Sequence, residues 1–376
     1  MLNAADFLCI LKHHGVDFFT GVPDSLLASF CTLLDDEHPK NNHIIAANEG
    51  NAIATAIGFH LATGKLPAVY MQNSGLGNAI NPLTSLADAE VYSVPMLLII
   101  GWRGEPNSKD EPQHLKQGRI TEKQLSTLEI PYWILDKETN HAAQISAACE
   151  IAIDTQAPVA LVIRQNTFAP YTSKLQRQVL SELEREACLR QILQLSKTDD
   201  LIISTTGKTS RELYELRNER NELQQDFLTV GGMGHTASIA LGVALGSPNR
   251  RIICLDGDGS LIMHMGSMAI ICQQQPQGFI HVLLNNAAHE SVGGQPTAAT
   301  TIDFSMLSKA LGYVHYAKAE TLSELSYHWQ HIDNLKGPVF LEIRLKCGSR
   351  SNLSRPTSTP SENKIAFMEK VYGLQH

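Results

Sequence analysis

Short apolar runs alternate along the chain with longer segments in which apolar residues recur with the period of a helix. The runs predict strands at 43–48, 66–72, 94–102, 158–164, 200–206, 250–255, 279–285 and 338–345. Each run is apolar at consecutive positions, as parallel strands covered by helices on both faces require. Helical patterns lie between them, such as Glu49–Thr63, which is closed by Gly64. The pattern predicts an α/β fold with doubly wound parallel sheets.

The alternation is interrupted once, in a polar and charged stretch near the middle of the chain. Because domains average roughly 150 residues, a chain of 376 residues is expected to form two. We predict two α/β domains of the same type, at 1–168 and 186–376, joined by a linker at 169–185. A second polar stretch, 348–363, precedes a final helix that is predicted from about Lys364. The sequence leaves open whether this second stretch acts as a lid.

The composition describes an ordinary globular protein, with 43% hydrophobic and 18% charged residues. The formal net charge is −8, and the chain lacks the clustered Lys and Arg that nucleic acid or an anionic membrane surface would require. The longest apolar run, Val94–Gly101, is far shorter than the roughly 18 residues of a membrane-spanning helix. The N-terminus has no signal-peptide pattern, and the seven cysteines include no C-x-x-C pair. We therefore expect a soluble, reduced, cytoplasmic protein that binds neither nucleic acid nor membranes.

The strongest local motif is LDGDGS (255–260), which ends an apolar strand with two glycines around Asp258. The next strand ends in Asn285 and Asn286, and the spacing leaves room for one crossover helix. The carboxyl ends of neighbouring parallel strands meet at one edge of the sheet, where ligands bind in open α/β sheets. A carboxylate and an amide oxygen at that edge are suitable ligands for Mg²⁺.

The residues around Asp258 also suit a phosphate group. Gly257 and Gly259 allow close approach of the backbone, and the amides of Gly259 and Ser260 can face a phosphate at a helix N-terminus. The alternative is an ordinary junction between a strand and a turn, because Asp-Gly pairs are common in turns. The paired asparagines at this spacing favour a binding site.

GDG followed by about two dozen residues and a pair of asparagines resembles the signature of the thiamine diphosphate enzymes. The resemblance implies that Asp258, Asn286 and the main-chain carbonyl of Ala288 hold Mg²⁺ against the diphosphate. It also implies a glutamate that opens a helix in the other domain and bonds to the aminopyrimidine ring, and HIIAANEG offers Glu49. Taken alone, Glu49 would be read as an acid favoured by the dipole at a helix N-terminus.

Two further stretches are similar to this family. GGMGHTASIALG resembles a Gly-rich turn in which an apolar side chain holds the cofactor bent. This implies that role for Met233 and a hydrogen bond to the Gly231 carbonyl, whereas the alternative is a Gly-rich entry into a helix. TTGKTSREL resembles a segment that contacts the diphosphate, here through Thr206 and Gly207. Lys208 in that segment is equally compatible with an anion contact and with a solvated surface lysine.

Within the family, the chain lacks the middle domain of the larger decarboxylases and synthases. Four stretches resemble the phosphonopyruvate decarboxylases more than the sulfopyruvate decarboxylases: 21–30, 71–86, 101–119 and 285–297. The resemblance implies decarboxylation of 3-phosphonopyruvate, an anionic 2-oxo acid, to phosphonoacetaldehyde and CO₂. The alternatives are sulfopyruvate or another short 2-oxo acid. A non-catalytic cofactor-binding subunit is less favoured, since Glu49 is present.

Candidate substrate residues follow strands of the first domain. They are Asp24 and Ser25 after the expected first strand, and Asn73 and Ser74 after strand 66–72. Basic residues are densest in the loop after strand 94–102, which contains Arg103, Lys109, His114, Lys116 and Arg119. A planar guanidinium suits phosphonate oxygens, so Arg103 is predicted to bind the substrate and His114 to act in catalysis. The alternative is a solvated loop whose charges offset neighbouring acids. His289 is a candidate proton relay, with a structural histidine as the alternative.

Glu49 and Asp258 belong to different predicted domains, so one cofactor needs both domains. The resemblance implies that the cofactor lies across an interface between two copies of the chain. We therefore expect a homodimer or a larger even homo-oligomer, with each site shared between chains.

Overall fold

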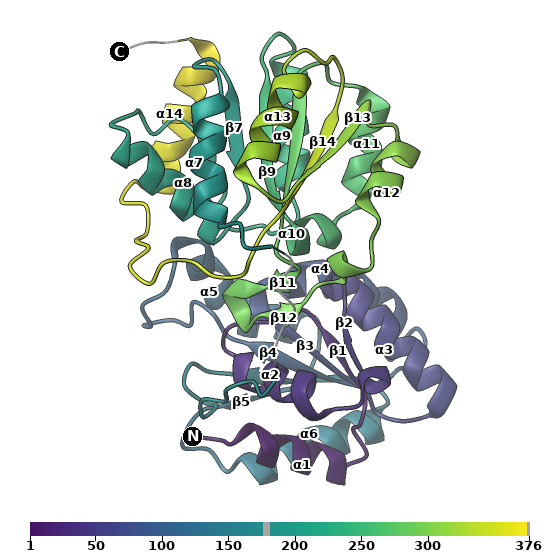
Figure 1. Cartoon of the computed structure of the whole chain (residues 1–376). Coiled ribbons are helices and arrows are strands. Elements are labelled where there is room, and N and C mark those ends of the chain that lie inside the picture. Colours follow the sequence, from purple (N-terminus) through teal and green to yellow (C-terminus); the bar gives the residue numbers. More distant parts are fainter. Residues whose placement is uncertain (176–180, 374–376) are drawn as a thin grey trace. The chain divides into compact units, whose positions relative to one another are not determined.

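The computed structural model describes residues 1–175 and 181–373 (Figure 1). The chain divides into two compact units. Unit 1 comprises Met1–Gln176 and Ser291–Gln295, and unit 2 comprises Arg177–Glu290 and Pro296–His376. The division falls within the predicted linker 169–185, of which 176–180 lies outside the described residues, as does 374–376 at the end of the predicted second domain. The sequence pattern does not indicate that Ser291–Gln295 belongs with unit 1.

Unit 1 contains a six-stranded parallel sheet with the strand order β2-β1-β3-β4-β6-β5. Its strands are β1 (Phe19–Gly21), β2 (His43–Ile45), β3 (Ala68–Gln72), β4 (Met96–Gly101), β5 (Tyr132–Leu135) and β6 (Pro158–Ile163). The interior strands β3, β4 and β6 are apolar at consecutive positions because helices cover both faces of the sheet.

Three helices contribute to the core on each face of this sheet. They are α1 (Ala4–His13), α2 (Ala28–Glu37) and α6 (His141–Thr155) on one face, and α3 (Glu49–Thr63), α4 (Leu76–Pro82) and α5 (Pro112–Thr127) on the other. Successive residues of β4 show the division, because Ile99 packs in the first core and Leu98 in the second. The predicted helix Glu49–Thr63 is confirmed, and Gly64 ends it in the left-handed conformation (φ 69°).

Unit 2 contains a second six-stranded parallel sheet, with the order β13-β14-β10-β9-β7-β8. Its strands are β7 (Leu201–Ser204), β8 (Phe227–Leu228), β9 (Ile252–Gly257), β10 (Phe279–Asn285), β13 (His315–Ala319) and β14 (Val339–Arg344). The stretch after β10 also contains the two-residue strands β11 (Ala288–His289) and β12 (Gln295–Pro296).

Helices again contribute to a core on each face. One face packs against α7 (Arg185–Leu195), α8 (Lys208–Glu219) and α13 (Leu322–Ile332). The other packs against α9 (Thr236–Gly246), α10 (Asp258–Met263), α11 (Gly266–Gln274), α12 (Phe304–Leu311) and α14 (Pro360–Tyr372). The predicted doubly wound α/β class is therefore confirmed for both units.

The structure differs from the sequence prediction in four strands and one helix start. The apolar runs omit β1, β5, β8 and β13, although a first strand before Asp24 is expected. β1 has only three residues, and the other three strands lie at the ends of their sheets with partly exposed faces. The final helix begins at Pro360 and not at Lys364. Thr359 and Glu362 form a capping box there, and this fixes the earlier start.

The polar stretch 348–363 is tied to helices of unit 2. Arg350 forms ion pairs with Glu186 of α7 (2.8 Å) and with Glu215 of α8. Thr357 forms a 2.7 Å hydrogen bond with the Tyr214 hydroxyl. These contacts hold the first part of the stretch against α7 and α8.

The described helices and the cysteines bear on the expectations about membranes and disulfides. No helix within 1–175 or 181–373 is both long and apolar enough to cross a membrane. All seven cysteines are free thiols, and five of them are buried. Burial raises the pKa of Cys188 to about 12, which keeps such a thiol protonated and unreactive.

Candidate active site

The loops that follow β9 and β10 bring the predicted metal ligands of unit 2 together. The two strands are parallel neighbours, with Gly257 paired to Leu284. Asp258 follows β9 as the first residue of α10, and Asn286 follows β10 directly. The backbone N–H of Asn286 donates a hydrogen bond to the Asp258 carboxylate, so the two residues are in contact.

Asp258 is a buried carboxylate that is only 3% exposed. Burial raises the pKa of Asp258 to about 6, although hydrogen bonds from Thr297 and from backbone N–H groups act to lower it. No Lys, Arg or His in the described part of the chain forms an ion pair with it. A divalent cation would stabilise the ionised form of such a group, so the surroundings of Asp258 fit Mg²⁺.

Asn286 and Ala288 supply the other two predicted ligand atoms. The Nδ2 group of Asn286 donates to Glu290 Oε2 (2.9 Å), and its Oδ1 accepts from Ala288 N (3.1 Å). Ala287 is in the left-handed region (φ 55°), and the turn keeps the main chain of Ala288 beside Asn286. Carboxylate, amide and carbonyl oxygens are the hard donors that Mg²⁺ prefers. These three residues could therefore hold the metal.

Gly259 lies in a narrow space between two other predicted site residues. A Cβ atom at this position would lie 3.1 Å from the His289 ring and 3.2 Å from the terminal methyl group of Met233. The three residues are thus brought together, and a larger residue at 259 would displace one of its neighbours. Burial lowers the pKa of His289 to about 4, so its imidazole is neutral near pH 7.

The remaining predicted cofactor residues of unit 2 lie at the same edge of the sheet. Ser260 Oγ accepts a hydrogen bond from Gly234 N (3.2 Å), which joins α10 to the Gly-rich turn at 231–234. Thr206 Oγ1 donates to Val230 O (2.8 Å), which joins the loop after β7 to that turn. The predicted residues therefore converge from the carboxyl ends of β7, β8, β9 and β10.

Lys208 begins α8, directly after Gly207, whose positive φ (92°) favours glycine. The structure adds a third alternative to an anion contact or a solvated lysine, because its Nζ lies 2.6 Å from Glu290 Oε1. Glu290 also accepts from Arg185 Nη1 (2.9 Å), and Arg185 makes two 2.8 Å bonds to Glu212. Burial acts to raise the pKa of Glu290, but Arg185 and Lys208 hold it below its usual value.

Sequence reasoning missed three members of this ion-pair group: Arg185, Glu212 and Glu290. They come from α7, α8 and the loop after β10, and no motif joins them along the chain. Arg185 falls in the predicted linker, yet its side chain is 7% exposed and belongs to the core of unit 2.

In unit 1, Glu49 is the first residue of α3, and its side chain is buried (6% exposed). Asn48 caps the helix by accepting from Asn51 N (2.9 Å). Asn78 of α4 donates from Nδ2 to Glu49 Oε2 (2.8 Å). Gly75 is required beside this group, because a Cβ atom there would collide with the Glu49 carboxylate. Asn78 and Gly75 both lie in the stretch 71–86 that resembles the phosphonopyruvate decarboxylases, but neither of them is assigned a role from the sequence.

Arg103 follows β4 and is paired with an acid. Its Nε and Nη2 groups donate to the two carboxylate oxygens of Asp110 (2.8 and 2.5 Å), and Nη1 donates to Ser25 Oγ (2.8 Å). Although burial opposes it, the guanidinium holds the pKa of Asp110 well below its usual range. The structure therefore brings Arg103 and Ser25 together and offsets the charge of Arg103 with Asp110.

Asp24 is fully buried at the carboxyl end of β1. Its two oxygens accept from Gln72 Nε2 (2.6 Å) and Leu26 N (2.9 Å), and burial raises the pKa of Asp24. Ser74 Oγ donates to Gln72 Oε1 (2.8 Å). Asp24, Gln72 and Ser74 thus form a hydrogen-bonded row at the ends of β1 and β3, in which Gln72 was not predicted.

Asn73 is buried, and its amide is engaged within unit 1. Its Nδ2 group donates to Arg103 O (2.8 Å) and to Thr121 Oγ1 (2.9 Å), and its Oδ1 accepts from Arg103 N (3.2 Å). A direct substrate contact through this amide would break these bonds. The contacts favour a role for Asn73 in holding the backbone of Arg103 against α5.

His114, Lys116 and Arg119 lie in α5 and not in a loop, which corrects the sequence prediction for this segment. Pro112 occupies the first position of the helix, where its missing N–H has no intrahelical partner to lose. The basic residues are therefore spread around a helix. Burial, and then Arg103, lower the pKa of His114, which favours its neutral form.

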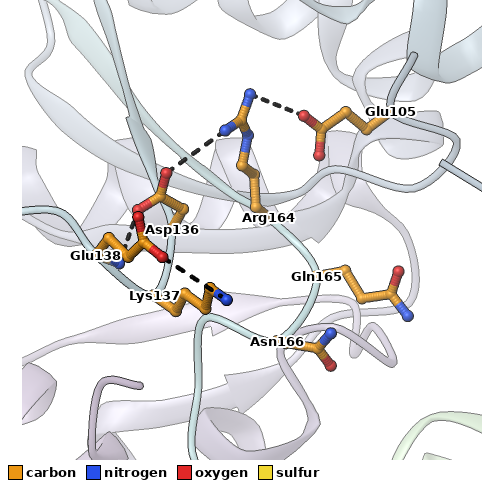
Figure 2. Close-up of a pocket in the computed structure, with 7 residues that line it drawn as sticks. All are labelled: Glu105, Asp136, Lys137, Glu138, Arg164, Gln165 and Asn166. Carbon is orange, nitrogen blue, oxygen red and sulfur yellow. Dashed lines mark hydrogen bonds and ion pairs between the residues drawn. The ribbon is translucent and has the colours of Figure 1, made fainter. Parts of the chain in front are cut away.

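A separate polar pocket of about 270 Å³ lies in unit 1 at the carboxyl ends of β4, β5 and β6 (Figure 2). Arg164 extends between Glu105 (2.8 Å) and Asp136 (3.4 Å), and Lys137 pairs with Glu138 (3.7 Å). None of the predicted site residues lines this pocket. Its acids and bases pair with one another, so it offers no strong charge to a ligand.

A buried polar group in the core of unit 2 was also not predicted. Cys254, Asp256 and His281 lie on β9 and β10, and their possible ligand atoms are within 4.8 Å of one another. His281 Nδ1 forms a 2.9 Å hydrogen bond with the Tyr313 hydroxyl, and His281 Nε2 lies 3.5 Å from Asp256 Oδ2. Asp256 Oδ1 accepts from Gly257 N (3.0 Å), which links this group to the GDG motif.

Comparison with protein-family models gives two matches. Residues 3–126 match the N-terminal TPP binding domain of thiamine pyrophosphate enzymes, and residues 205–343 match the C-terminal TPP binding domain. Thiamine pyrophosphate is thiamine diphosphate under another name. The two matches lie in the two units, and no middle domain is evident between them, as predicted.

Similar curated proteins cover nearly the whole chain. A phosphonopyruvate decarboxylase of Streptomyces viridochromogenes is 34% identical over 96% of this chain and 93% of its own length. One of Streptomyces hygroscopicus is 33% identical over 98% and 94%. A sulfopyruvate decarboxylase of Methanosarcina acetivorans is 27% identical over 96% of each chain. With both binding domains matched and these relatives aligned over both units, the chain belongs to the thiamine pyrophosphate enzyme family.

Proposed function

We propose that this protein is a thiamine diphosphate- and Mg²⁺-dependent carboxy-lyase that converts 3-phosphonopyruvate to phosphonoacetaldehyde and CO₂. Support for the reaction class comes from the family and from the names of the three relatives, all of them decarboxylases of short anionic 2-oxo acids. Support for the phosphonate comes from the higher identity to the two phosphonopyruvate decarboxylases (34% and 33%) than to the sulfopyruvate decarboxylase (27%).

Asp258, Asn286 and the Ala288 carbonyl would hold Mg²⁺, and Thr206, Gly207, Gly257, Gly259 and Ser260 would surround the diphosphate. Met233 and the Gly231 carbonyl would contact the rings. When bound, thiamine diphosphate supplies an electron sink for the pair released as the carboxylate leaves. The buried Glu49 carboxylate would bond to the aminopyrimidine ring and hold a proton there, and Asn78 keeps Oε2 of Glu49 in a fixed direction.

Two histidines could move protons at the reacting carbon. Both His289 and His114 are predominantly neutral near pH 7, because burial lowers their pKa values. A neutral imidazole can accept a proton on one nitrogen and donate from the other. Neutral side chains also avoid a fixed cation beside the substrate carboxylate, and such a cation would oppose the loss of CO₂.

The phosphonate end of the substrate would bind near the carboxyl ends of β1, β3 and β4. Arg103 and Ser25 already contact each other there and could both donate to phosphonate oxygens. Asp24 and Ser74 lie in the neighbouring hydrogen-bonded row. Asp110 offsets the charge of Arg103. The guanidinium would therefore bind a dianion mainly through directed hydrogen bonds and less through an unpaired positive charge.

An assay of CO₂ release from phosphonopyruvate and from sulfopyruvate tests the proposal. We expect turnover that requires both added thiamine diphosphate and Mg²⁺ after chelation and dialysis, with a higher kcat/KM for the phosphonate. A clear preference for sulfopyruvate would overturn the choice of substrate. Turnover that does not depend on the cofactor would overturn the reaction itself.

We further propose that the active form is a homodimer or a larger even assembly. Glu49 belongs to unit 1 and Asp258 to unit 2, and a single cofactor needs a group from each. In this proposal each site takes unit 1 from one copy and unit 2 from another. A fully active monomer, measured by light scattering at the assay concentration, would contradict it.

A further inference from the structure

The carboxylate of Glu290 receives hydrogen bonds from three side chains of unit 2. Lys208 Nζ lies 2.6 Å from Oε1, and Arg185 Nη1 and Asn286 Nδ2 each lie 2.9 Å from Oε2. Glu290 is therefore fixed by two cations and in turn contacts a proposed metal ligand.

The cations that hold Glu290 are themselves held. Arg185 is 7% exposed and bonds through Nε and Nη2 to both oxygens of Glu212, which is 1% exposed. Arg185 comes from α7, Glu212 and Lys208 come from α8, and Glu290 follows β11. Because both helices pack on the core of the sheet, the position of the Glu290 carboxylate is set by the fold of unit 2.

An ionised carboxylate can accept hydrogen bonds but cannot donate them. An asparagine amide has a donor side and an acceptor side, and only the donor side can face Glu290. The amide of Asn286 must therefore direct Nδ2 to Glu290 and Oδ1 to the opposite side. Oδ1 is the atom that a hard cation such as Mg²⁺ requires, because the –NH₂ group has no lone pair to offer.

Resting on the proposed metal site, we infer that Glu290 is a positioning residue that fixes Asn286 with Oδ1 as the metal ligand. Glu290 acts through Asn286 and contacts neither metal nor substrate in this role. Arg185 and Lys208 serve the same end by holding the carboxylate in place.

The neighbouring asparagine is held in the same way. Asn285 Nδ2 donates to Glu342 Oε1 (3.0 Å), and Glu342 is 2% exposed on β14. Two consecutive asparagines thus each direct the amide nitrogen to a carboxylate, Asn286 to one four residues along the same loop and Asn285 to one on β14. Orientation by acceptor-only partners is therefore a repeated feature of the end of β10.

Glu290 also lies at the point where the chain passes from unit 2 to unit 1. Glu290 is the last residue of unit 2 before Ser291–Gln295, which belongs to unit 1. Shortly after the chain returns to unit 2, Thr297 Oγ1 donates to the Asp258 carboxylate, and Thr297 N donates to Ala287 O (3.0 Å). Residues on both sides of this five-residue excursion therefore contact proposed metal ligands, Asn286 on one side and Asp258 on the other.

The test is a calorimetric titration of Mg²⁺ into protein with saturating thiamine diphosphate. Glu290→Gln can present its own –NH₂ group to Asn286, so that only the Ala288 N–H bond to Oδ1 (3.1 Å) still opposes reversal of the Asn286 amide. We expect the Mg²⁺ dissociation constant to rise about 10- to 100-fold, as for loss of an outer-shell partner of a metal ligand. Glu219→Gln on the same helix as Lys208 removes only an exposed ion pair with Arg190, and it should leave the constant unchanged.

Glu290→Asp separates loss of the Asn286 contact from loss of folding. It keeps the negative charge for Arg185 and Lys208 but is one methylene too short to reach Asn286, so Mg²⁺ should again bind more weakly while the melting temperature without metal changes little. Lys208→Met removes one of the two cations that hold the carboxylate but keeps the Asn286–Glu290 bond, so its Mg²⁺ constant should rise less than that of either Glu290 variant. If both Glu290 variants fold and bind Mg²⁺ within twofold of the unmodified protein, the inference is wrong.

Asp258→Ala separates this result from a failure of the proposed metal site. If it weakens Mg²⁺ binding while the Glu290 variants do not, the metal site stands and only the positioning role is lost. If Mg²⁺ binds normally to Asp258→Ala, the metal lies elsewhere and both proposals fail.

Discussion

Units 1 and 2 have the same sheet topology. When strands are numbered by their order within each unit, both sheets read 2-1-3-4-6-5, and all neighbouring strands are parallel. The sequences of the two units show no residue-level repeat. The common topology therefore comes from the shared rhythm of apolar strands and crossover helices.

The two units carry different residues after equivalent strands. After the second strand, unit 1 carries Glu49 and unit 2 carries the Gly-rich turn with Met233. After the third, unit 1 carries the amide and hydroxyl groups of 73–74, whereas unit 2 carries the carboxylate of Asp258. After the fourth, unit 1 carries Arg103 and unit 2 carries Asn286. The same sheet topology thus presents different functional groups at the carboxyl ends of equivalent strands.

An amide–carboxylate hydrogen bond supports a site residue in each unit, but the site residue is the carboxylate in unit 1 and the amide in unit 2. In unit 1, the Asn78 amide holds the Glu49 carboxylate (2.8 Å). In unit 2, the Glu290 carboxylate holds the Asn286 amide (2.9 Å). The comparison teaches that in an amide–carboxylate pair either group can be the functional one, with the other group holding it in place. The functional group is the one that follows its strand or begins its helix: Glu49 at the start of α3 and Asn286 after β10.

The largest expected effect is that of Glu49→Gln in unit 1. Loss of a group that holds a proton in the reaction should lower kcat by about 10²- to 10⁴-fold. Cofactor affinity, measured by quenching of tryptophan fluorescence, should change much less. The matched control is Glu150→Gln at an exposed position of α6. Near-normal turnover in Glu49→Gln would mean that unit 1 does not contribute the acid of the site.

A pair of core substitutions tests whether the units are equivalent as folds. Leu98 and Leu283 lie in the fourth strand of their sheets and are fully buried. Leu98→Ala and Leu283→Ala should each reduce the free energy of unfolding by about 2–5 kcal/mol, measured by urea denaturation. A loss in only one of them would show that the two cores do not limit stability equally.

Asn78→Ala measures the support that Glu49 receives. Hydrogen bonds to charged groups contribute about 1.5–3 kcal/mol, so kcat should fall roughly 10- to 100-fold, with little change in cofactor affinity. Asn81→Ala, at an exposed position of the same helix, is the control. If Asn78→Ala lowers only the melting temperature, the amide supports the fold and not the carboxylate, and the parallel with Glu290 fails.

The effect that is smallest at neutral pH concerns acid stability. His43 opens the second strand of unit 1, where unit 2 has Phe227. Burial, followed by His38, lowers the pKa of His43 from 6.5 to about 4. The unfolded chain therefore binds a proton more readily, and this contribution to stability is complete above pH 6.5 and is lost as the pH falls toward 4.

His43→Phe introduces the residue that unit 2 carries and should flatten this acid dependence. Urea denaturation across that pH range measures the slope of the unfolding free energy for both proteins. His13→Phe on the exposed side of α1 should keep the original slope. An unchanged slope in His43→Phe would mean that another group causes the acid sensitivity.

The apolar pattern predicted most of the interior strands, because parallel strands covered on both faces need consecutive apolar residues. It failed where that requirement is relaxed, at the edge strand β13 and the short β1. The helix α5 was read as a loop, because its surface is largely polar and its basic residues drew attention to charge rather than to helical period.

The sequence by itself determined the α/β class, the two-domain organisation and the residues that belong to motifs, such as Asp258, Asn286 and Glu49. These are local properties, since a motif is contiguous and strand ends follow from apolar runs. Only the tertiary structure decided that Asn78 holds Glu49 and that Glu290 holds Asn286. Asn78 and Glu49 come from separate helices, so the packing of these helices on the sheet sets the distance between their side chains. Glu290 is only four residues from Asn286, but its carboxylate is held by Arg185 of α7 and Lys208 of α8, and these contacts depend on packing rather than on spacing along the chain.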